Sequence, residues 1–130
     1  MALAGILLLA LGCSRSGGPE QAPAKQTEPA PDAAPSVHEQ AWEQIREGAL
    51  LLDVRTPTEF AQGHLENALN IPYDQLRERV AELGPDRDRA VVLYCRTGRR
   101  SELARQTLRE LGFTHVLNGG GYEALRQTRR

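Results

Sequence analysis

Short apolar runs alternate with amphipathic segments along most of the chain. Four of the runs have the length and aliphatic content of buried strands: they span residues 49–54, 68–71, 90–94 and 115–117. Segments 73–83 and 101–111 lie between these runs and carry apolar side chains at helical spacing. Strands that alternate with helices in this way predict an α/β fold, with a small, mostly parallel β-sheet flanked by helices on both faces.

Capping signals mark the starts of two more helices. Ser36 and Glu39 have the spacing of a capping box, in which each side chain bonds the backbone N–H of the other residue. Thr56 and Glu59 repeat this spacing, with a proline in the first turn. A last helix is expected after a glycine-rich turn at residues 119–121.

The N-terminal quarter of the chain differs in composition from the rest. Residues 1–12 form an apolar run with the length of the core of a secretory signal peptide. Residues 13–35 carry no large apolar side chain, so they cannot bury enough surface to offset the entropy of ordering them. We therefore expect a signal peptide, a flexible tether, and one folded domain over residues 36–130.

Cys13 ends a short motif of its own. Residues 10–13 resemble a bacterial lipobox, at which the signal peptide is removed and the new N-terminal cysteine receives lipid. The resemblance implies that Cys13 is a lipidation site and that the domain is anchored at the cell envelope, facing the periplasm or the extracellular side. A cleaved signal with a soluble periplasmic domain is the alternative.

The charge and the cysteine content exclude several classes of partner. The formal net charge is −1, so no broad basic surface is expected and nucleic acid is not an expected partner. No run reaches the roughly 18 apolar residues that span a bilayer, which leaves the lipid anchor as the expected membrane contact. Cys13 and Cys95 lie in very different contexts, so no disulfide is expected. No metal-ligand spacing exists, and we expect a monomer without a metal or cofactor.

Cys95 occupies the most informative position in the chain. It follows the apolar run at residues 90–94 and precedes a helix signal that begins at Ser101. A cysteine at such a strand-to-helix turn faces backbone N–H groups and the positive end of a helix dipole, and three arginines follow within five residues. Both effects favour the thiolate, which is the nucleophilic form. We therefore interpret Cys95 as a nucleophile rather than as a buried structural cysteine.

Four segments, in the same order, resemble the rhodanese domain of thiosulfate sulfurtransferases. Residues 95–101 resemble its active-site loop. The other segments resemble its first strand with the following helix, its second signature block and its C-terminal signature: residues 51–60, 63–72 and 116–125. Leu125 stands where the C-terminal signature usually has tryptophan, and we expect this difference to alter packing rather than chemistry.

The resemblance implies a single-domain sulfurtransferase. Cys95 would attack the outer sulfur of thiosulfate, or of a similar small anionic donor, and become a persulfide. Cyanide or a thiol would then accept the sulfur. The residues expected to hold the donor and the sulfur are Arg96, Thr97, Gly98, Arg99, Arg100 and Ser101. The sequence leaves open which of the three arginines contacts the donor.

Several residues near this loop are assigned supporting roles. Ser101 is interpreted as the N-cap of the following helix, with a hydrogen bond toward the sulfur as the alternative. Asp53 and Arg55, at the end of the first strand, resemble the structural charge pair of the family, with Glu59 as a further member. His64 follows a glycine in a turn and is interpreted as a hydrogen-bonded structural residue rather than as part of the cleft.

Two other functions fit the same fold less well. Dual-specificity phosphatases of the cell-cycle type resemble it, but their loop runs from the cysteine over five residues to an arginine, where this chain has Ser101. A non-enzymatic module that carries persulfide or binds other proteins is the alternative to an enzyme. Modules of that kind commonly lack the cysteine, whereas this chain keeps Cys95 and its basic loop.

Overall fold

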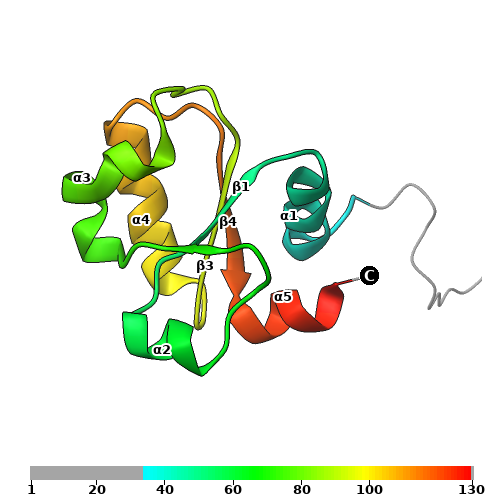
Figure 1. Cartoon of the computed structure of the whole chain (residues 1–130). Coiled ribbons are helices and arrows are strands. Elements are labelled where there is room, and N and C mark those ends of the chain that lie inside the picture. The colour runs from blue at the N-terminus through cyan, green and yellow to red at the C-terminus, as the bar shows by residue number, and fades with distance from the viewer. Residues whose placement is uncertain (1–33, 130) are drawn as a thin grey trace, which may run out of the picture. The chain divides into compact units, whose positions relative to one another are not determined.

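Four parallel strands form one sheet, in the order β2-β1-β3-β4 (Figure 1). The computed structural model describes residues 34–129. The strands are β1 (Leu50–Asp53), β2 (Leu69–Asn70), β3 (Val91–Cys95) and β4 (Val116–Gly121). Parallel neighbours need crossover connections, and these place helices on the faces of the sheet. The predicted α/β class is confirmed.

Helices cover both faces of this sheet. On one face, α4 (Arg99–Glu110) packs against β3 and β4 and beside α3 (Leu76–Arg79). On the other face, α1 (Val37–Arg46) packs against β4 and β3 and beside α5 (Tyr122–Thr128). α2 (Pro57–Gln62) lies toward the end of the sheet from which α5 begins (Figure 1).

Two helices begin at the capping boxes that the sequence predicts. Ser36 accepts a hydrogen bond from the backbone of Glu39 at 3.2 Å, and the Glu39 carboxylate accepts one from the backbone of Ser36 at 2.8 Å. Thr56 and Glu59 form the same reciprocal pair at the start of α2, at 3.2 Å and 3.1 Å. Each box satisfies backbone N–H groups that a helix start otherwise leaves unpaired.

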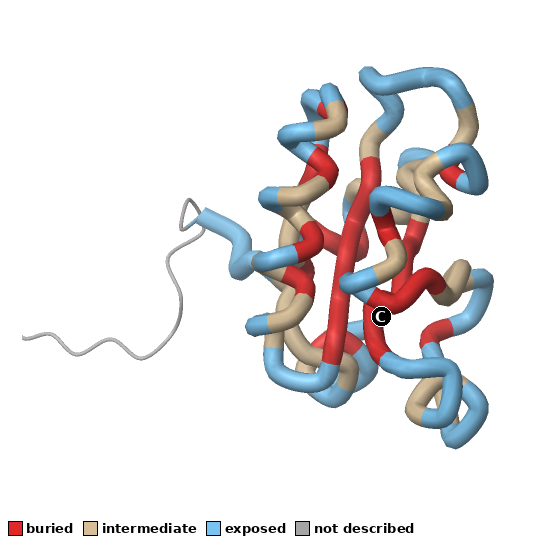
Figure 2. Tube along the Cα trace, turned by 90° about the vertical axis from the view of Figure 1, so that its left-hand side faces the viewer, coloured by how far each residue is buried: buried red, intermediate tan, exposed pale blue. Residues whose placement is uncertain are grey.

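The core is divided between the two faces of β3. Val91, Leu93 and Cys95 belong to a cluster that includes residues of α4, whereas Val92 and Tyr94 belong to a cluster with residues of α1 and α5. This division follows from the alternation of side chains along a strand. Figure 2 shows the buried residues concentrated along the strands. The Cys95 side chain therefore faces α4, and the Tyr94 ring faces the opposite side.

The segment predicted as one helix over residues 73–83 is divided into three short pieces. The 3₁₀-helices η1 (Tyr73–Gln75) and η2 (Val80–Leu83) flank α3. The first turn of the segment closes by a hydrogen bond from the Gln75 backbone N–H to the Pro72 carbonyl. The last turn closes by a hydrogen bond from the Gly84 N–H to the Ala81 carbonyl. Both bonds span three residues, which is the tighter 3₁₀ pattern.

The predicted signal peptide, most of the predicted tether, and Cys13 lie outside the described residues. Within residues 34–129, no helix combines the length and the apolar character needed to cross a membrane.

Candidate active site

Cys95 is the last residue of β3, and its sulfur lies inside a curled backbone loop. The residue is 1% exposed. Gly98 adopts a φ of +95°, a left-handed conformation that glycine reaches without steric cost. That turn directs the Gly98 N–H toward the sulfur, and the distance from this nitrogen to Sγ is 2.9 Å.

Burial alone would raise the pKa of the Cys95 thiol, because it disfavours the charged form. Hydrogen bonds outweigh burial and leave the pKa below that of an ordinary thiol. They come from the Ser101 side chain and from backbone N–H groups of Ser101, Thr97 and Gly98. The loop backbone therefore favours the nucleophilic thiolate.

Ser101 does not cap α4, so that prediction is wrong. α4 begins at Arg99, and the residue before it is Gly98, which has no side chain to act as a cap. The left-handed turn at Gly98 starts the helix earlier than the sequence pattern indicates. Ser101 is instead buried in the first turn, where its Oγ lies 3.6 Å from the Cys95 Sγ. This position matches the alternative role, a hydrogen bond toward the sulfur.

Arg100 forms a two-pronged ion pair with Glu59 of α2. Its Nη1 and Nη2 donate to the two carboxylate oxygens at 2.8 Å and 2.9 Å. These bonds are the main cause that lowers the pKa of Glu59 to about 2. Arg100 also interacts electrostatically with Cys95. The Glu59 carboxylate therefore bonds directly to Arg100, while it interacts with Arg55 of the predicted charge pair only electrostatically.

Asp53 and Arg55 form a buried ion pair at the end of β1, with 2.7 Å between the Arg55 Nη2 and the Asp53 Oδ2. The same Nη2 donates to the Gly63 carbonyl at 2.6 Å, which ties β1 to the turn after α2. The guanidinium also stacks over the rings of Tyr94 and Tyr122. The pair therefore holds several segments together at this edge of the sheet.

Tyr94 and Tyr122 were not singled out by the sequence, although both adjoin the site. Burial raises the pKa of Tyr94 above its ordinary value, so its hydroxyl stays neutral. That hydroxyl accepts the backbone N–H of Leu65 at 3.0 Å. Tyr94 thus joins the strand that carries Cys95 to the loop before β2.

A cleft of about 380 Å³ lies beside the Cys95 loop and is lined in part by Arg55, Glu59, Arg96 and Glu123. Three of these charges are already compensated: Arg55 by Asp53, Glu59 by Arg100 and Glu123 by Arg126. Arg96 forms no ion pair with any described residue. The cleft therefore contains one uncompensated positive charge, on the residue that follows Cys95 in sequence.

Thr97 and Arg99 point outward from the same loop. Both are exposed, and Arg99 forms no ion pair within residues 34–129. The structure thus separates the predicted loop arginines. Arg96 is also exposed but lines the cleft, Arg99 is exposed outside it, and Arg100 is bound to Glu59.

The glycines at residues 119–121 belong to β4 rather than to the predicted turn. Their lack of side chains lets the strand run directly beside the Cys95 loop. A Cβ on Gly121 would lie 2.6 Å from the Arg96 carbonyl oxygen, and one on Gly119 would lie 3.1 Å from the Leu93 carbonyl oxygen. Only glycine permits this approach of two backbones.

Asn118, which the sequence analysis did not single out, precedes these glycines and bonds to the site. Its side chain donates to the Gly98 carbonyl at 3.0 Å and accepts the Ser101 hydroxyl at 2.7 Å. The signal available in the sequence was its place in the segment 116–125, which resembles a family signature.

Leu125 is fully buried, in one cluster with Trp42. Its carbonyl oxygen accepts the Trp42 indole N–H at 2.8 Å. The difference from the usual tryptophan therefore lies in the packing of α5 against α1.

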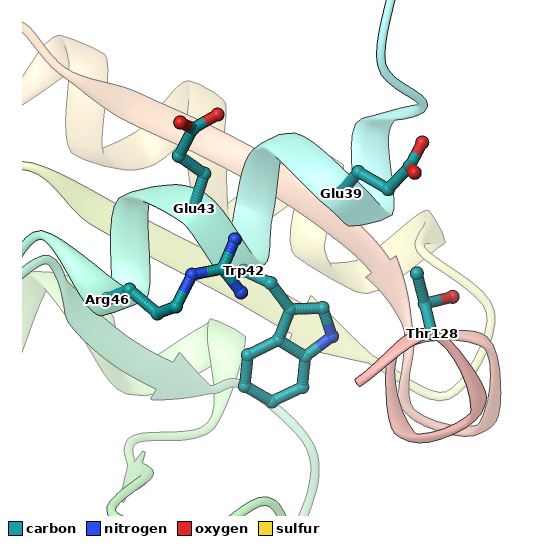
Figure 3. Close-up of a pocket in the computed structure, with 5 residues that line it drawn as sticks. All are labelled: Glu39, Trp42, Glu43, Arg46 and Thr128. Atoms are coloured by element: carbon teal, nitrogen blue, oxygen red, sulfur yellow. The ribbon is translucent and has the colours of Figure 1, made fainter. Parts of the chain in front are cut away.

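His64 and the residues of a second hollow lie outside the Cys95 loop. His64 stacks on Phe60 and bonds its carbonyl through Nδ1 at 2.8 Å, which confirms the structural interpretation of this histidine. A second hollow of about 360 Å³ is lined by Trp42, Arg46 and other residues of α1 and α5, and by none of the Cys95 loop (Figure 3). Among residues 34–129, no three His, Cys, Asp or Glu side chains are grouped to hold a metal ion.

Comparison with known proteins places the chain in a family. Residues 37–128 match the rhodanese-like domain, so the chain belongs to the rhodanese-like family. Thiosulfate sulfurtransferase PspE of Escherichia coli (strain K12) is 44% identical over 70 residues, which cover 54% of this chain and 67% of that protein. A sulfurtransferase of Allochromatium vinosum is 46% identical over 72 residues, covering 55% of this chain and 65% of that protein.

Solved structures agree with this assignment. A structure described as rhodanese with anions from E. coli has a TM-score of 0.56 and 41% identity, covering 58% of this chain and 89% of that chain. The human single-domain sulfurtransferase TSTD1 has a TM-score of 0.61 and 27% identity, covering 71% of this chain and 94% of that chain.

The family includes proteins with other named functions. A tRNA uridine(34) hydroxylase of Escherichia coli O1:K1 is 37% identical over 87 residues, which cover 25% of that larger protein. The matched segments span about two thirds of PspE and of the A. vinosum protein. The family is thereby established, and the reaction of this chain is a separate question.

Proposed function

We propose that this protein is a sulfurtransferase that moves a sulfane sulfur from thiosulfate, or a similar small anionic donor, to cyanide or a thiol through a Cys95 persulfide. The observation that carries the proposal is the position of the Cys95 sulfur at the carboxyl end of β3. The Gly98 N–H donates to it at 2.9 Å, and the backbone N–H groups of Thr97 and Ser101 also lower the pKa of its thiol. A sulfur held by several N–H donors is stabilised whenever it bears negative charge.

The reaction has two displacement steps. In the first, the Cys95 thiolate attacks the outer sulfur of thiosulfate and forms a new S–S bond. The S–S bond of the donor breaks, and sulfite leaves with the electron pair. In the second, the acceptor attacks the outer sulfur of the persulfide and the Cys95 thiolate is regenerated. The sulfur of Cys95 is negative before the first step and after the second, and the outer sulfur is negative between them.

Arg96 is the residue proposed to bind the donor. It lines the cleft beside Cys95 and forms no ion pair with a described residue, so its charge is available to a dianion. Arg100 has a different proposed role, because both of its terminal nitrogens already bond Glu59. It would position the start of α4 and add positive charge near the sulfur without leaving Glu59.

Intact mass spectrometry of the chain after incubation with thiosulfate tests the first step. We expect one added sulfur atom in the native chain and in Cys13→Ala, and none in Cys95→Ser. Loss of the added sulfur on treatment with cyanide, with formation of thiocyanate, tests the second step. A persulfide that forms but never turns over would favour a persulfide-carrying module. A native chain that gains no sulfur would contradict the proposed function.

We further propose that residues 1–12 direct the protein to the cell envelope and that Cys13 carries the lipid anchor. Support comes from the lipobox-like residues 10–13 and from the composition of the segment that follows. Cell fractionation of the native chain and of Cys13→Ala tests this. The native chain should be found with membranes, and the variant should not. A native chain found soluble in the cytoplasm with residues 1–13 attached would contradict the proposal.

A further inference from the structure

Asn118 joins β4 to the loop that precedes α4, and every hydrogen-bonding position of its side-chain amide is occupied. Its Nδ2 donates to the Gly98 carbonyl at 3.0 Å and to the Glu102 carboxylate at 3.1 Å. Its Oδ1 accepts the Gly120 N–H at 2.9 Å and the Ser101 hydroxyl at 2.7 Å. An amide has two donated hydrogens and one oxygen with two lone pairs, so no position is left free.

These partners determine the direction of the Ser101 hydroxyl. The Gly120 N–H only donates and the Gly98 carbonyl only accepts, so the amide oxygen faces Gly120 and the amide nitrogen faces Gly98. Since Oδ1 carries no hydrogen, the contact at 2.7 Å requires Ser101 to donate to Asn118. A hydroxyl has a single proton. That proton is therefore not available at the same time to the Cys95 Sγ, which lies 3.6 Å from the Ser101 oxygen.

We propose that Asn118 is a positioning residue that holds the Ser101 proton while Cys95 is a neutral thiol and yields it to the sulfur when the sulfur becomes negative. The inference rests on the proposed function, in which that sulfur acts as a thiolate. No covalent bond breaks, because the hydroxyl turns about its Cβ–Oγ bond. The amide oxygen keeps its second bond, from Gly120. In the neutral state the thiol can donate its own hydrogen to the Ser101 oxygen.

Asn118 therefore opposes ionisation of Cys95, which is the opposite of what a merely structural residue would do. When the Ser101 hydroxyl turns toward the sulfur, it loses its short hydrogen bond to Asn118. Without the Asn118 side chain there is no such bond to lose, so ionisation of Cys95 becomes more favourable. A residue that only held the Gly98 carbonyl would have another effect. Its removal would loosen the N–H groups around the sulfur and raise the pKa of the thiol. The direction of the shift thus separates the two roles.

Charged groups from three helices surround this cluster. Glu102 of α4 pairs with Arg105, whose hydrogen bonds are the main cause that lowers the pKa of Glu102 to about 2. Glu102 is therefore ionised throughout the range in which a thiol titrates. Arg100 of α4 is paired with Glu59 of α2. His38 of α1 lies against Gly120 of β4, so a His38→Gln variant measures the effect of His38 on Cys95 ionisation directly.

The experiment measures ionisation of Cys95 in the full chain, in Asn118→Ala, in Ser101→Ala and in the double variant. Ultraviolet absorbance of the thiolate is followed against pH. Each protein is compared with its own Cys95→Ser counterpart, so that tyrosines and Cys13 cancel. We expect Asn118→Ala to raise the ionisation constant by roughly three- to tenfold, which is a lower thiol pKa. Ser101→Ala should lower the constant, and in that background Asn118→Ala should no longer raise it.

Asn70→Ala is the matched control. Its Nδ2 also fastens a chain segment at the edge of the sheet, through the carbonyls of Asp53 and Arg55, but it does not bond Ser101. Ionisation of Cys95 should be unchanged in this variant. The absorbance measurement needs no sulfur transfer, so its outcome is independent of whether the proposed function is correct.

Two results would overturn the proposal: an upward pKa shift in Asn118→Ala, or an equal downward shift with and without the Ser101 hydroxyl. If Asn118→Ala does not fold, Asn118→Asp gives the same test. Its carboxylate holds a donated proton more strongly than an amide does, so it should raise the thiol pKa more when Ser101 is present than in Ser101→Ala. Equal effects in the two backgrounds would overturn the proposal as well.

Discussion

Two groups of polar contacts meet at the carboxyl edge of the sheet, and they differ in what they hold. The sulfur cradle consists of Cys95 and the groups around its sulfur: Thr97, Gly98, Ser101 and Asn118. The charged frame consists of two ion pairs, Asp53 with Arg55 and Glu59 with Arg100. The cradle is built from neutral groups, which bond the sulfur or, in the case of Asn118, bond the Ser101 hydroxyl beside it. The frame is built from full charges, and in each pair both the cation and the anion are side chains of the protein.

This difference teaches how a basic sequence around a nucleophile should be interpreted. Three arginines near Cys95 suggest that positive charge lowers the pKa of the thiol and binds the donor. In the structure, the hydrogen bonds that oppose the effect of burial come from Ser101, Thr97 and Gly98. Arg100 is paired with Glu59, and Arg96 is the cleft arginine that forms no ion pair with a described residue. Proximity in sequence therefore does not give three equivalent arginines.

Substitution of Cys95 should have the largest effect on activity, and it changes the sulfur cradle without changing the charged frame. Cys95→Ser should abolish sulfur transfer from thiosulfate to cyanide, because an alcohol is not appreciably ionised at neutral pH and cannot form a persulfide. The fold should persist, since serine is similar in size and can still accept the Gly98 N–H. Thiocyanate formation and circular dichroism measure the two properties. Turnover retained in the variant would remove Cys95 from the mechanism.

Substitution in the frame should instead reduce stability. Asp53→Ala leaves Arg55 buried without its carboxylate, and breaking a buried pair in this way costs about 3–5 kcal/mol in the free energy of unfolding. Denaturant-induced unfolding measures the loss. Arg126→Ala is the matched control, because its pair with Glu123 is more than half exposed on both sides, and the loss of an exposed pair should change the free energy of unfolding far less. Similar losses in the two variants would show that burial of the Asp53–Arg55 pair does not increase its contribution to the free energy of unfolding.

The cleft is lined by Arg55 and Glu59 of the frame and by Arg96 of the Cys95 loop. The loop arginines should therefore differ in their effect on donor binding. Arg96→Ala should raise KM for thiosulfate, corresponding to about 1–3 kcal/mol for the loss of a charged contact. Arg99→Ala should leave KM nearly unchanged, because Arg99 is exposed outside the cleft. Higher ionic strength should weaken donor binding in the native protein more than in Arg96→Ala. Equal KM values for the two variants would reject Arg96 as the donor-binding cation.

Much of the fold could be predicted because its signals are local. Each strand is a short apolar run, and the capping boxes at Ser36 and Thr56 each need only a few consecutive residues. The position of Cys95 at the end of a strand could also be predicted, because an apolar run ends at this residue and a glycine turn follows. The start of α4 was predicted less accurately, because two local signals for a helix start compete there. Ser101 is a good capping residue, but the left-handed turn at Gly98 begins the helix earlier.

The contacts that the sequence did not predict join residues distant in the chain. Asn118 lies 17 positions from Ser101, and Glu59 lies 41 positions from Arg100. The sheet order brings these positions together, since β4 lies beside β3 and α2 follows β1. A periodicity argument uses neighbours along the chain only, so it cannot pair such side chains. The glycines at 119–121 were interpreted as a turn for the same reason, because their close approach to β3 and the Arg96 carbonyl is a tertiary contact.

Glu59→Gln should give the smallest effect and tests the exposed half of the frame. The pair with Arg100 is partly exposed, so its loss should cost about 1 kcal/mol at neutral pH. The pKa of Glu59 is lowered from 4.5 to about 2, chiefly by hydrogen bonds from Arg100. A lowered pKa means that the contribution is complete above about pH 4.5 and is lost as the pH falls toward 2. The difference in unfolding free energy between the native protein and Glu59→Gln should therefore be constant near neutrality and shrink below that range. A difference that persists unchanged to low pH would show that the glutamate contributes through packing or neutral hydrogen bonds rather than through its charge.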